Sequence, residues 1–546
     1  MNTKLRTFVA GAAGMAVALG IAELVHGLYQ SVPSVLVAVA QRIIKLTPGG
    51  FATKAIETLG KADIPTLITF LVLSTLVLAG LLAYLSLRSR IGALIGVGIL
   101  AAVAIAASLA EPSATPFATV LADIGALGIG SIISNFLLYA SRLRTLAVSQ
   151  PESLGSDGEP RSEGVRSKEA HSASGFAVSR RNFLLLSSGA AVAGISAAGV
   201  GRALAGGGQS GSSSTAPLKL PQTSASEAGA TTHETLPPPP AGVSIDVPGM
   251  PPLITPAKDF YIIDTNLVSP RINVDSWSLS VKGAVDNPIE LSYKDLLSMS
   301  TREADITLSC VSNAVGGRLV SNGRWTGVLL TDVLAEAGVS SDKIGSASEQ
   351  LVGRSADGWT SGFKTNIALD GRQALVAFGL NGDELPIKHG YPVRLVVPGL
   401  YGYVSATKWL TEIELTNWDF DAYWIQRSWS KEGPIKTQSR IDTVEAGDRL
   451  PAGVIPVGGV AWAPHRGIER VEVSTDGGET WDDAKLADQL DMDTWRQYVY
   501  DWEAKPGNYT LKVRATDGEG ETQTAKETPP HPSGATGYHT VRVTVT

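Results

Sequence analysis

The chain has 546 residues, enough for several domains, and its charge is unevenly divided: residues 1–205 carry a formal +6 and residues 206–546 carry −13. The acidic C-terminal part argues against nucleic-acid binding, which needs a basic surface. The single cysteine, Cys310, excludes an intramolecular disulfide, an iron–sulfur cluster, a cysteine-based zinc site and a CxxCH haem motif.

Four apolar segments within residues 1–148 are long enough to cross about 30 Å of hydrocarbon, which takes about 20 residues. The expected spans are 7–29, 65–87, 91–110 and 117–140. Basic residues precede the first span, separate the second from the third and follow the fourth, which predicts a cytoplasmic N-terminus. Residues 31–64 hold four further basic residues, so we expect Val35–Leu46 to lie in the membrane interface as an amphipathic helix.

Residues 149–205 combine a polar stretch, expected to be a cytoplasmic loop, with a fifth apolar segment. This segment begins Ser179-Arg180-Arg181-Asn182-Phe183-Leu184, which resembles a twin-arginine export signal, a route for folded proteins. The alternative is a pair of basic residues flanking a fifth span. Ala203-Leu204-Ala205 resembles a cleavage site, so the sequence leaves open whether the segment is retained as an anchor.

Two ionisable residues of the first span, Glu23 and His26, share one helix face because they are three apart. We favour an interhelical hydrogen bond for them over contact with a quinone, a proton path or a partner. Since His26 is the only histidine in the four spans, a bis-histidine haem within them is excluded.

The sequence after the fifth segment changes character twice. Residues 206–257, rich in Gly, Ser, Thr and Pro, predict a linker. Residues 258–420 mix short strands and helices without strict βα alternation, which predicts an α+β domain. Residues 434–546 hold short alternating strands and a glycine hairpin near Thr475–Thr480, which predict an immunoglobulin-like β-sandwich.

Two features of the α+β region carry chemistry. Cys310 ends a predicted strand, before a glycine-containing loop; a lone cysteine is ordinarily a small buried hydrophobe. Folded export, however, is typical of proteins that receive a cofactor first, and a thiolate suits a metal that brings its other ligands. The second feature is the set of donors His389, Arg394 and Lys408 around a glycine-rich loop, which suits an anionic, phosphate-bearing ligand.

These motifs, in this order, resemble the sulfite-oxidase family of molybdenum enzymes over about residues 260–416. The matching segments are Thr307–Asn313, Arg324–Val328, His389–Arg394, Val396–Gly399 and Lys408–Leu410. The C-terminal region resembles the dimerisation domain of that family, through Ala461-Trp462 and Asp476-Gly477-Gly478 among others. With the spans and the internal twin-arginine segment, the chain resembles a membrane-anchored bacterial branch of the family.

The resemblance implies one molybdenum–molybdopterin per chain, with Cys310 as the protein ligand of the metal and with neither haem nor iron–sulfur cluster. It implies pterin contacts from Tyr261, Thr265, Asn266, Ser355, His389, Arg394, Ser405 and Lys408. It also makes Asn313, Arg324 and Phe363 candidates for the substrate pocket, and implies a homodimer through the C-terminal domain.

Departures from the family pattern limit the substrate. Ala314 and Val315 stand where animal and plant sulfite oxidases have adjacent arginines, Asp264-Thr265-Asn266 where they have Arg-Asn-His, and Phe363 where they have an active-site tyrosine. Because an anion such as sulfite needs cationic donors to offset its desolvation, a neutral sulfoxide or N-oxide fits better. Arg318 or Arg324 are the candidates for a relocated charge.

The sequence therefore predicts an extracytoplasmic oxidoreductase, anchored in a bacterial cell membrane by several spans, that transfers an oxygen atom to or from a small molecule. Its electrons are expected to pass to or from a separate redox protein or a quinone. One alternative is sulfite oxidation with relocated arginines. Another, of a different class, is an anchored adhesion or scaffold protein whose molybdenum fold is empty.

Overall fold

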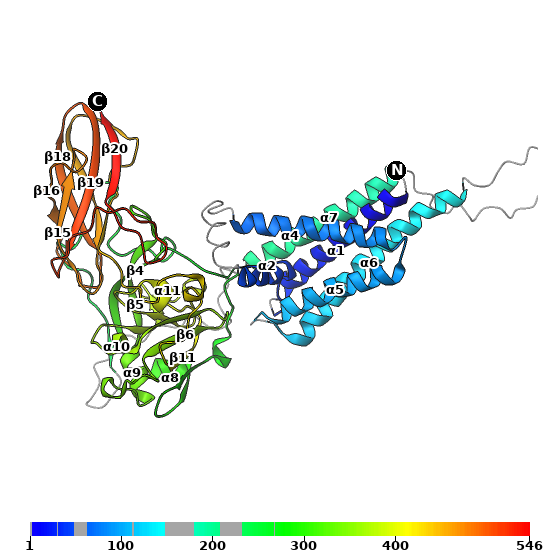
Figure 1. Ribbon diagram of the computed structural model, residues 1–546, viewed down its shortest axis with the longest axis horizontal. Helices are drawn as coiled ribbons and strands as arrows, with labels where there is room; N and C mark the ends of the chain where they lie inside the picture. The colour runs from blue at the N-terminus through cyan, green and yellow to red at the C-terminus, as the bar shows by residue number, and fades with distance from the viewer. Residues whose placement is uncertain are drawn as a thin grey trace, which may run out of the picture. The chain divides into compact units, whose positions relative to one another are not determined.

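The structure, a computed structural model, describes residues 3–29, 31–47, 63–111, 114–147, 180–207, 232–266 and 268–546. The chain falls into two units, Met1–Gly211 and Ser212–Thr546, which we call the N-terminal and C-terminal units (Figure 1). The expected cytoplasmic loop, Ser179 and residues 208–231 of the expected linker lie outside the described residues. The finer domain boundaries expected from the sequence stay predictions.

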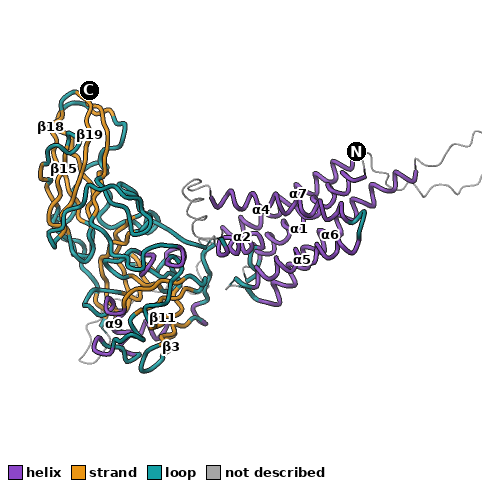
Figure 2. The backbone as a smooth tube through the Cα atoms, viewed as in Figure 1, coloured by secondary structure: helices purple, strands orange, loops and turns teal. Residues whose placement is uncertain are grey.

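The N-terminal unit is helical throughout its regular structure (Figure 2). Its described helices are α1 (Thr3–Leu28), α2 (Val35–Leu46), α4 (Asp63–Leu85), α5 (Arg90–Leu109), α6 (Pro116–Ala147) and α7 (Arg180–Gly207). Among the described residues, five helices are long and apolar enough to cross a membrane: all of these except α2. They confirm the four expected spans and the fifth apolar segment, and they indicate a multi-pass membrane protein.

Helices α1 and α7 pack with their backbones in contact. A Cβ atom added to Gly20 would lie 2.2 Å from the carbonyl oxygen of Gly194, and one added to Gly201 would lie 2.2 Å from that of Glu23. Such close approach is available only to residues without a side chain, and it is a common way for membrane helices to associate.

Glu23 of α1 is buried and has two partners from other parts of the unit. Its carboxylate accepts a hydrogen bond of 2.5 Å from the Ser34 hydroxyl, just before α2, and lies 3.4 Å from Nε of Arg202 in α7. The interhelical hydrogen bond expected for this residue is therefore confirmed. His26 instead makes a local contact of 2.8 Å from Nδ1 to the Val32 carbonyl oxygen.

The first part of the C-terminal unit contains two mixed sheets with short helices around them (Figure 1). One sheet has the order β1 (His233–Glu234), β4 (Thr301–Ser309), β5 (Val320–Leu329), β8 (Leu375–Leu380), β10 (Arg394–Val396), with β9 (Asp383–Glu384) paired to β8. The other has the order β3 (Ile289–Ser292), β2 (Ser278–Gly283), β11 (Leu410–Thr416), β6 (Gln350–Ser355), β7 (Thr360–Lys364).

The helices are α8 (Tyr293–Ser298), α9 (Leu330–Glu336), α10 (Thr365–Ala368) and α11 (Gly402–Ser405). Short 3₁₀ turns are η3 (Val274–Ser276), η4 (Ser341–Lys343), η5 (Ile387–His389) and η6 (Ile425–Arg427). This arrangement confirms the expected α+β class.

The last part of the unit is a β-sandwich, as expected. One sheet has the order β12 (Gln438–Ile441), β14 (Gly453–Trp462), β18 (Arg496–Ala504), β17 (Lys485–Leu486). The second has the order β13 (Arg449–Leu450), β20 (His539–Val545), β19 (Gly507–Asp517), β15 (Ile468–Ser474), β16 (Asp482–Asp483). Alternate residues of both sheets, such as Val457 and Leu511, are fully buried in a shared core. The expected glycine hairpin joins β15 to β16, with Gly477 and Gly478 at φ values of +85° and +100°.

Strand β4 is hydrogen-bonded to the loop before β18, so the sandwich contacts the α+β part directly. The backbone N–H of Thr307 donates to the carbonyl oxygen of Asp493 at 2.9 Å, and its hydroxyl accepts from the backbone N–H of Trp495 at 2.8 Å. The indole N–H of Trp495 donates to the Leu253 carbonyl oxygen at 2.8 Å. The structure around β4, which leads to Cys310, is thus built from three distant parts of the chain: β4 itself, the segment around Leu253 and the loop before β18.

Candidate functional site

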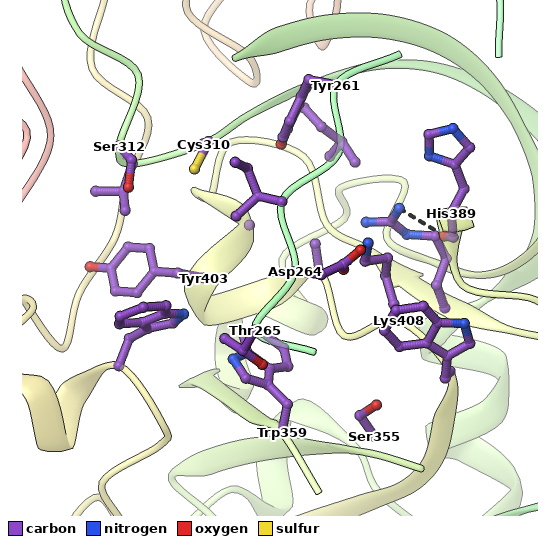
Figure 3. A pocket seen from close by; sticks show the side chains of 18 of the residues that line it. Tyr261, Asp264, Thr265, Cys310, Ser312, Ser355, Trp359, His389, Tyr403 and Lys408 are labelled. Atoms are coloured by element: carbon purple, nitrogen blue, oxygen red, sulfur yellow. Dashed lines mark hydrogen bonds and ion pairs between the residues drawn. The ribbon is translucent and has the colours of Figure 1, made fainter. Parts of the chain in front are cut away.

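A cavity with about 870 Å³ of empty space, counted out to its mouth, lies among the loops that follow the strands of the α+β part. Seven of the residues predicted to hold a cofactor or metal line it together (Figure 3): Tyr261, Thr265, Cys310, Ser355, His389, Arg394 and Lys408. These residues span almost 150 positions of sequence, and the fold brings them to one place.

Cys310 follows the last residue of β4 and is held by its backbone, whose N–H donates to the Leu319 carbonyl oxygen at 2.9 Å. Burial raises the pKa of the thiol, although hydrogen bonds from the backbone and hydroxyl of Ser312 act in the opposite direction. A buried thiolate therefore needs a strong compensating cation, which a metal ion supplies.

Arg394 opens β10 and is only 5 % exposed. Its Nη1 donates to the His389 carbonyl oxygen at 3.0 Å, and its guanidinium carbon lies 4.9 Å from the centre of the Trp325 ring. Within the described residues no carboxylate lies within 4.0 Å of it. Burial lowers the pKa of Arg394 to about 10, so it is still a cation at neutral pH. A buried cation without a counter-ion favours an anionic ligand.

His389 ends η5 and is neutral at physiological pH, because burial lowers its pKa to about 4. Its Nε2 lies 2.8 Å from the Ala257 carbonyl oxygen, which can only accept, so the ring proton is assigned to Nε2. This histidine is therefore fixed as a donor to the backbone, with Nδ1 left as an acceptor. Its edge contacts the ring of Phe260, with centroids 5.6 Å apart.

Lys408 and Asp264 form an ion pair in the cavity wall. The ammonium also donates to the Lys388 carbonyl oxygen at 3.0 Å and lies 4.9 Å from the Trp409 ring centre. Burial raises the pKa of Asp264, which the positive charge of Lys408 partly counteracts. Asp264 is a lining residue that we did not predict as part of the site, and Asp357 is a second carboxylate in the lining, so the two cations Arg394 and Lys408 stand against two carboxylates there.

A wall of aromatic side chains lines the rest of the cavity: Trp359, Tyr403, Trp424 and Trp429. The Tyr403 hydroxyl donates to the Ser430 carbonyl oxygen at 2.6 Å, which fixes the ring. The indole nitrogen of Trp429 is buried and has no hydrogen-bond partner among the described residues. Trp424 and Trp429 were not predicted from the sequence, because residues 421–433 fell between the two expected domains. The density of aromatic residues from Trp418 to Trp429 was the available signal.

Five other predicted site residues are not among those that line the cavity. Asn313 accepts from the Leu319 backbone N–H at 2.8 Å and shapes the loop after Cys310. Arg324 is held by Asp305, with Nη2 2.8 Å from Oδ2. Phe363 packs in the hydrophobic core, and the Ser405 hydroxyl donates to the Tyr401 carbonyl oxygen at 3.1 Å. The fifth is Asn266. Arg318, the other candidate for a relocated charge, is exposed and pairs with Glu445.

Comparison with known proteins agrees with this geometry. Residues 266–424 match the family model described as "Oxidoreductase molybdopterin binding domain". The C-terminal unit thus carries a region that matches oxidoreductase molybdopterin-binding domains. The rat mitochondrial sulfite oxidase is 30% identical over 271 residues, which cover 43% of this chain and 49% of the relative. The Arabidopsis thaliana sulfite oxidase is 28% identical, covering 45% and 72% respectively.

The molybdopterin domain is also similar to a relative with a different name. The NADH nitrate reductase of spinach (Spinacia oleracea) is 27% identical over 290 residues, covering 43% of this chain and 31% of that protein. The chain spans about half the length of the animal sulfite oxidases that it matches. It is a molybdopterin-dependent oxidoreductase by family, and its substrate must be argued from its own cavity.

Proposed function

We propose that this chain binds one molybdenum–molybdopterin in the cavity of its C-terminal unit and transfers an oxygen atom to or from a neutral small molecule. The observation that supports it most is the pairing of a buried thiol, Cys310, with a buried cation that lacks a carboxylate partner among the described residues, Arg394. These two groups fit the two chemically different ends of the cofactor, its metal and its phosphate. When bound, the group supplies two-electron oxygen-atom transfer.

The side chains at the two sides of the cavity are proposed to bind different parts of the cofactor. Cys310 is the proposed metal ligand, and Arg394 with Lys408 binds the phosphate or pterin. Figure 3 shows Lys408 and His389 on one side of the cavity and Cys310, Ser312 and Tyr403 on the other. The aromatic wall beside Cys310 then excludes water from the reacting atoms, which strengthens every electrostatic contact there.

The substrate is proposed to be a neutral oxide, such as a sulfoxide or an N-oxide. The lining residues include only two arginines or lysines, Arg394 and Lys408, and Lys408 is paired with Asp264. Arg318 and Arg324, which sulfite oxidation would need, have their own partners outside the cavity. Trp429 brings a buried indole N–H with no acceptor among the described residues, and the oxygen of an oxide is such an acceptor.

Metal and pterin analysis of the purified chain, produced in a host that makes molybdopterin, tests the cofactor assignment. We expect about one molybdenum per chain, and an at least tenfold loss in Cys310→Ser with unchanged circular dichroism. A well-folded wild-type protein without molybdenum would overturn the proposal. Steady-state turnover of a sulfoxide, an N-oxide and sulfite then tests the substrate: turnover of sulfite alone would contradict the neutral oxide.

The molybdopterin domain is proposed to lie on the extracytoplasmic face of a bacterial membrane, with α7 as the export signal and as a retained anchor. Two observations support retention: the backbone contact of α7 with α1, and the ion pair of Arg202 with Glu23. Ala203–Ala205 also lies inside α7 rather than in an extended segment. A tag at the N-terminus should stay on the mature protein, and Arg180→Lys with Arg181→Lys should block export. Loss of the tag in wild-type cells would contradict retention.

A further inference from the structure

A second cavity lies within the N-terminal unit, among five of its helices. It holds about 990 Å³ of empty space, counted out to its mouth. Each helix contributes apolar side chains to its wall, among them Leu19 of α1, Leu36 of α2, Leu78 of α4, Leu100 of α5 and Leu127 of α6. A cavity with such walls, in a unit that spans a membrane, accepts a ligand that arrives from the lipid phase.

Three polar side chains interrupt this apolar lining: Ser74, Thr75 and Asp123. The hydroxyls of Ser74 and Thr75 donate to the Leu71 carbonyl oxygen of their own helix, at 3.0 and 2.7 Å. Asp123 differs, because it is 3 % exposed and its Oδ2 has no hydrogen-bond partner among the described residues. A buried acceptor without a donor loses its hydrogen bonds to water without replacing them, and this cost is larger if the group is charged.

Asp123 has one polar neighbour on the next helix. The hydroxyl of Ser108 in α5 interacts with its carboxylate, but Ser108 is not among the residues that line the cavity. Asp123 is therefore the buried acceptor that the cavity itself offers to a ligand. Apolar walls with one such acceptor call for a ligand with an apolar tail and a hydroxylated head.

We infer that this cavity binds a quinol, whose ring hydroxyl donates to Oδ2 of Asp123 and whose isoprenoid tail follows the leucine-lined wall. The choice of a quinol over another hydroxylated lipid rests on the proposed function. Reduction of an oxide to the parent compound and water takes up two electrons and two protons, and oxidation of a quinol to a quinone releases the same two electrons and two protons. The N-terminal unit thus provides the docking place of the electron donor.

The test is saturable binding of tritiated menaquinol-2, kept reduced under argon, to the whole chain in phosphatidylcholine nanodiscs. We expect one site per chain. Asp123→Leu removes the acceptor and Ala104→Phe fills the cavity from α5, so each should weaken binding at least tenfold. Asp123→Asn keeps a carbonyl oxygen and should weaken binding less. The matched control is Ile124→Phe, since Ile124 is the next residue of α6 and is 55 % exposed.

Three results would overturn the inference: no saturable binding, binding unchanged in both Asp123→Leu and Ala104→Phe, or equal competition by the dimethyl ether of the same quinol. The ether has the same tail and ring but no donor, so equal competition would mean an apolar crevice for lipid. Because binding is measured without turnover, the two proposals fail separately. Protein without molybdenum that binds menaquinol contradicts the proposed function alone, whereas molybdenum-loaded protein that does not bind it contradicts the quinol site alone.

Discussion

In the N-terminal unit, large apolar side chains are exposed along four of the five candidate spans and at both ends of the fifth, α1. In the C-terminal unit, five are exposed among the described residues: Ile262, Ile263, Val268, Val454 and Met492. Glycine is also used differently. The described glycines with positive φ all lie in the C-terminal unit, where they turn the backbone between strands. In the N-terminal unit, Gly20 and Gly201 instead let two helices touch.

Buried charge extends this comparison. In the C-terminal unit most buried ions have a partner of opposite charge, as Arg466 has in Asp517, with Nε 2.9 Å from Oδ2. Arg394 is the exception in the molybdopterin domain, and Asp123 is its counterpart in the N-terminal unit. The two units differ in solvent, but our proposals follow one rule in both: the ligand binds beside a buried polar group that lacks a partner of its own.

The largest expected effect tests that rule in the C-terminal unit. Arg394→Met should lower the molybdopterin content at least tenfold, because the phosphate loses its buried cation. The unfolding free energy of the cofactor-free protein should change by no more than about 2 kcal/mol, because two effects oppose each other. Loss of the contact with Trp325 destabilises the fold, whereas removal of an uncompensated buried charge stabilises it. Pterin analysis and urea unfolding measure the two quantities.

Arg466→Met is the matched control. It leaves the carboxylate of Asp517 buried and unpaired, so it should destabilise the unit by about 3–5 kcal/mol. It should leave the molybdopterin content of the folded fraction unchanged. If Arg394→Met destabilises the cofactor-free protein as much as Arg466→Met does, Arg394 stabilises the fold in the same way as Arg466. The proposed difference between a ligand-binding cation and a structural one is then wrong.

Acid should weaken the C-terminal unit. The pKa of His389 falls from an ordinary 6.5 to about 4, because burial disfavours its charged form. Between these two values the unfolded chain binds the proton and the folded chain does not, so this stability is complete above pH 6.5 and is lost as the pH falls toward 4. The loss for a shift of this size is about 3 kcal/mol.

Tryptophan fluorescence during urea unfolding at pH 7 to 4.5 measures this loss in the C-terminal unit alone, because all eleven tryptophans lie in it. His389→Gln should flatten the pH dependence. His539→Gln should do the same, since burial also lowers the pKa of His539 to about 4 and its Nδ1 accepts from the Ile441 backbone N–H at 3.0 Å. An unchanged slope in both variants would contradict the prediction.

A smaller effect sharpens the comparison of the glycines. A Cβ atom at Gly194 would lie 2.3 Å from the Ala16 carbonyl oxygen, whereas one at Gly199 of the same helix meets nothing within 4 Å. Gly194→Leu should therefore destabilise the N-terminal unit by about 2 kcal/mol and Gly199→Leu by less than about 0.5 kcal/mol. Circular dichroism during SDS unfolding measures both. Equal effects would mean that α1 and α7 do not pack through this contact.

The smallest effect concerns the ion pair beside that contact. Glu23→Gln keeps an oxygen for the Ser34 hydroxyl but removes the attraction to Arg202, whose side chain is 51 % exposed. An ion pair with one exposed partner contributes little, so we expect a loss below about 1 kcal/mol in the same SDS unfolding experiment. A loss above 3 kcal/mol would show that the pair is effectively buried.

The parts that sequence predicted well depend on local pattern. Span length and hydropathy are local, so the five candidate spans were expected, and α2 was expected at Val35–Leu46, where it lies. The residues around Cys310, His389 and Lys408 were found because their motif order is specific. The sequence cannot show which donors are already used: Arg324 carries a suitable guanidinium, but Asp305 already accepts from it.

The aromatic wall depends on long-range packing instead. Trp424 and Trp429 reach the cavity because the segment after β11 folds back, where Trp424 contacts Tyr423 and the Tyr403 ring lies 5.9 Å from that of Trp429. No motif spacing predicts that return. Asp264 is similar: its position was noted as a departure from the family pattern, but only the fold shows that it pairs with Lys408.

The hydrogen bonds of Thr307 to Asp493 and Trp495 have a consequence for synthesis. Strand β4, which ends just before Cys310, receives its last partners from residues up to 188 positions later in the chain. At ribosomal speeds of about 5–20 residues per second, that delay is roughly 10 to 40 s. The cofactor's cradle is therefore finished only when most of the sandwich has been translated, so loading belongs to the time after synthesis rather than during it.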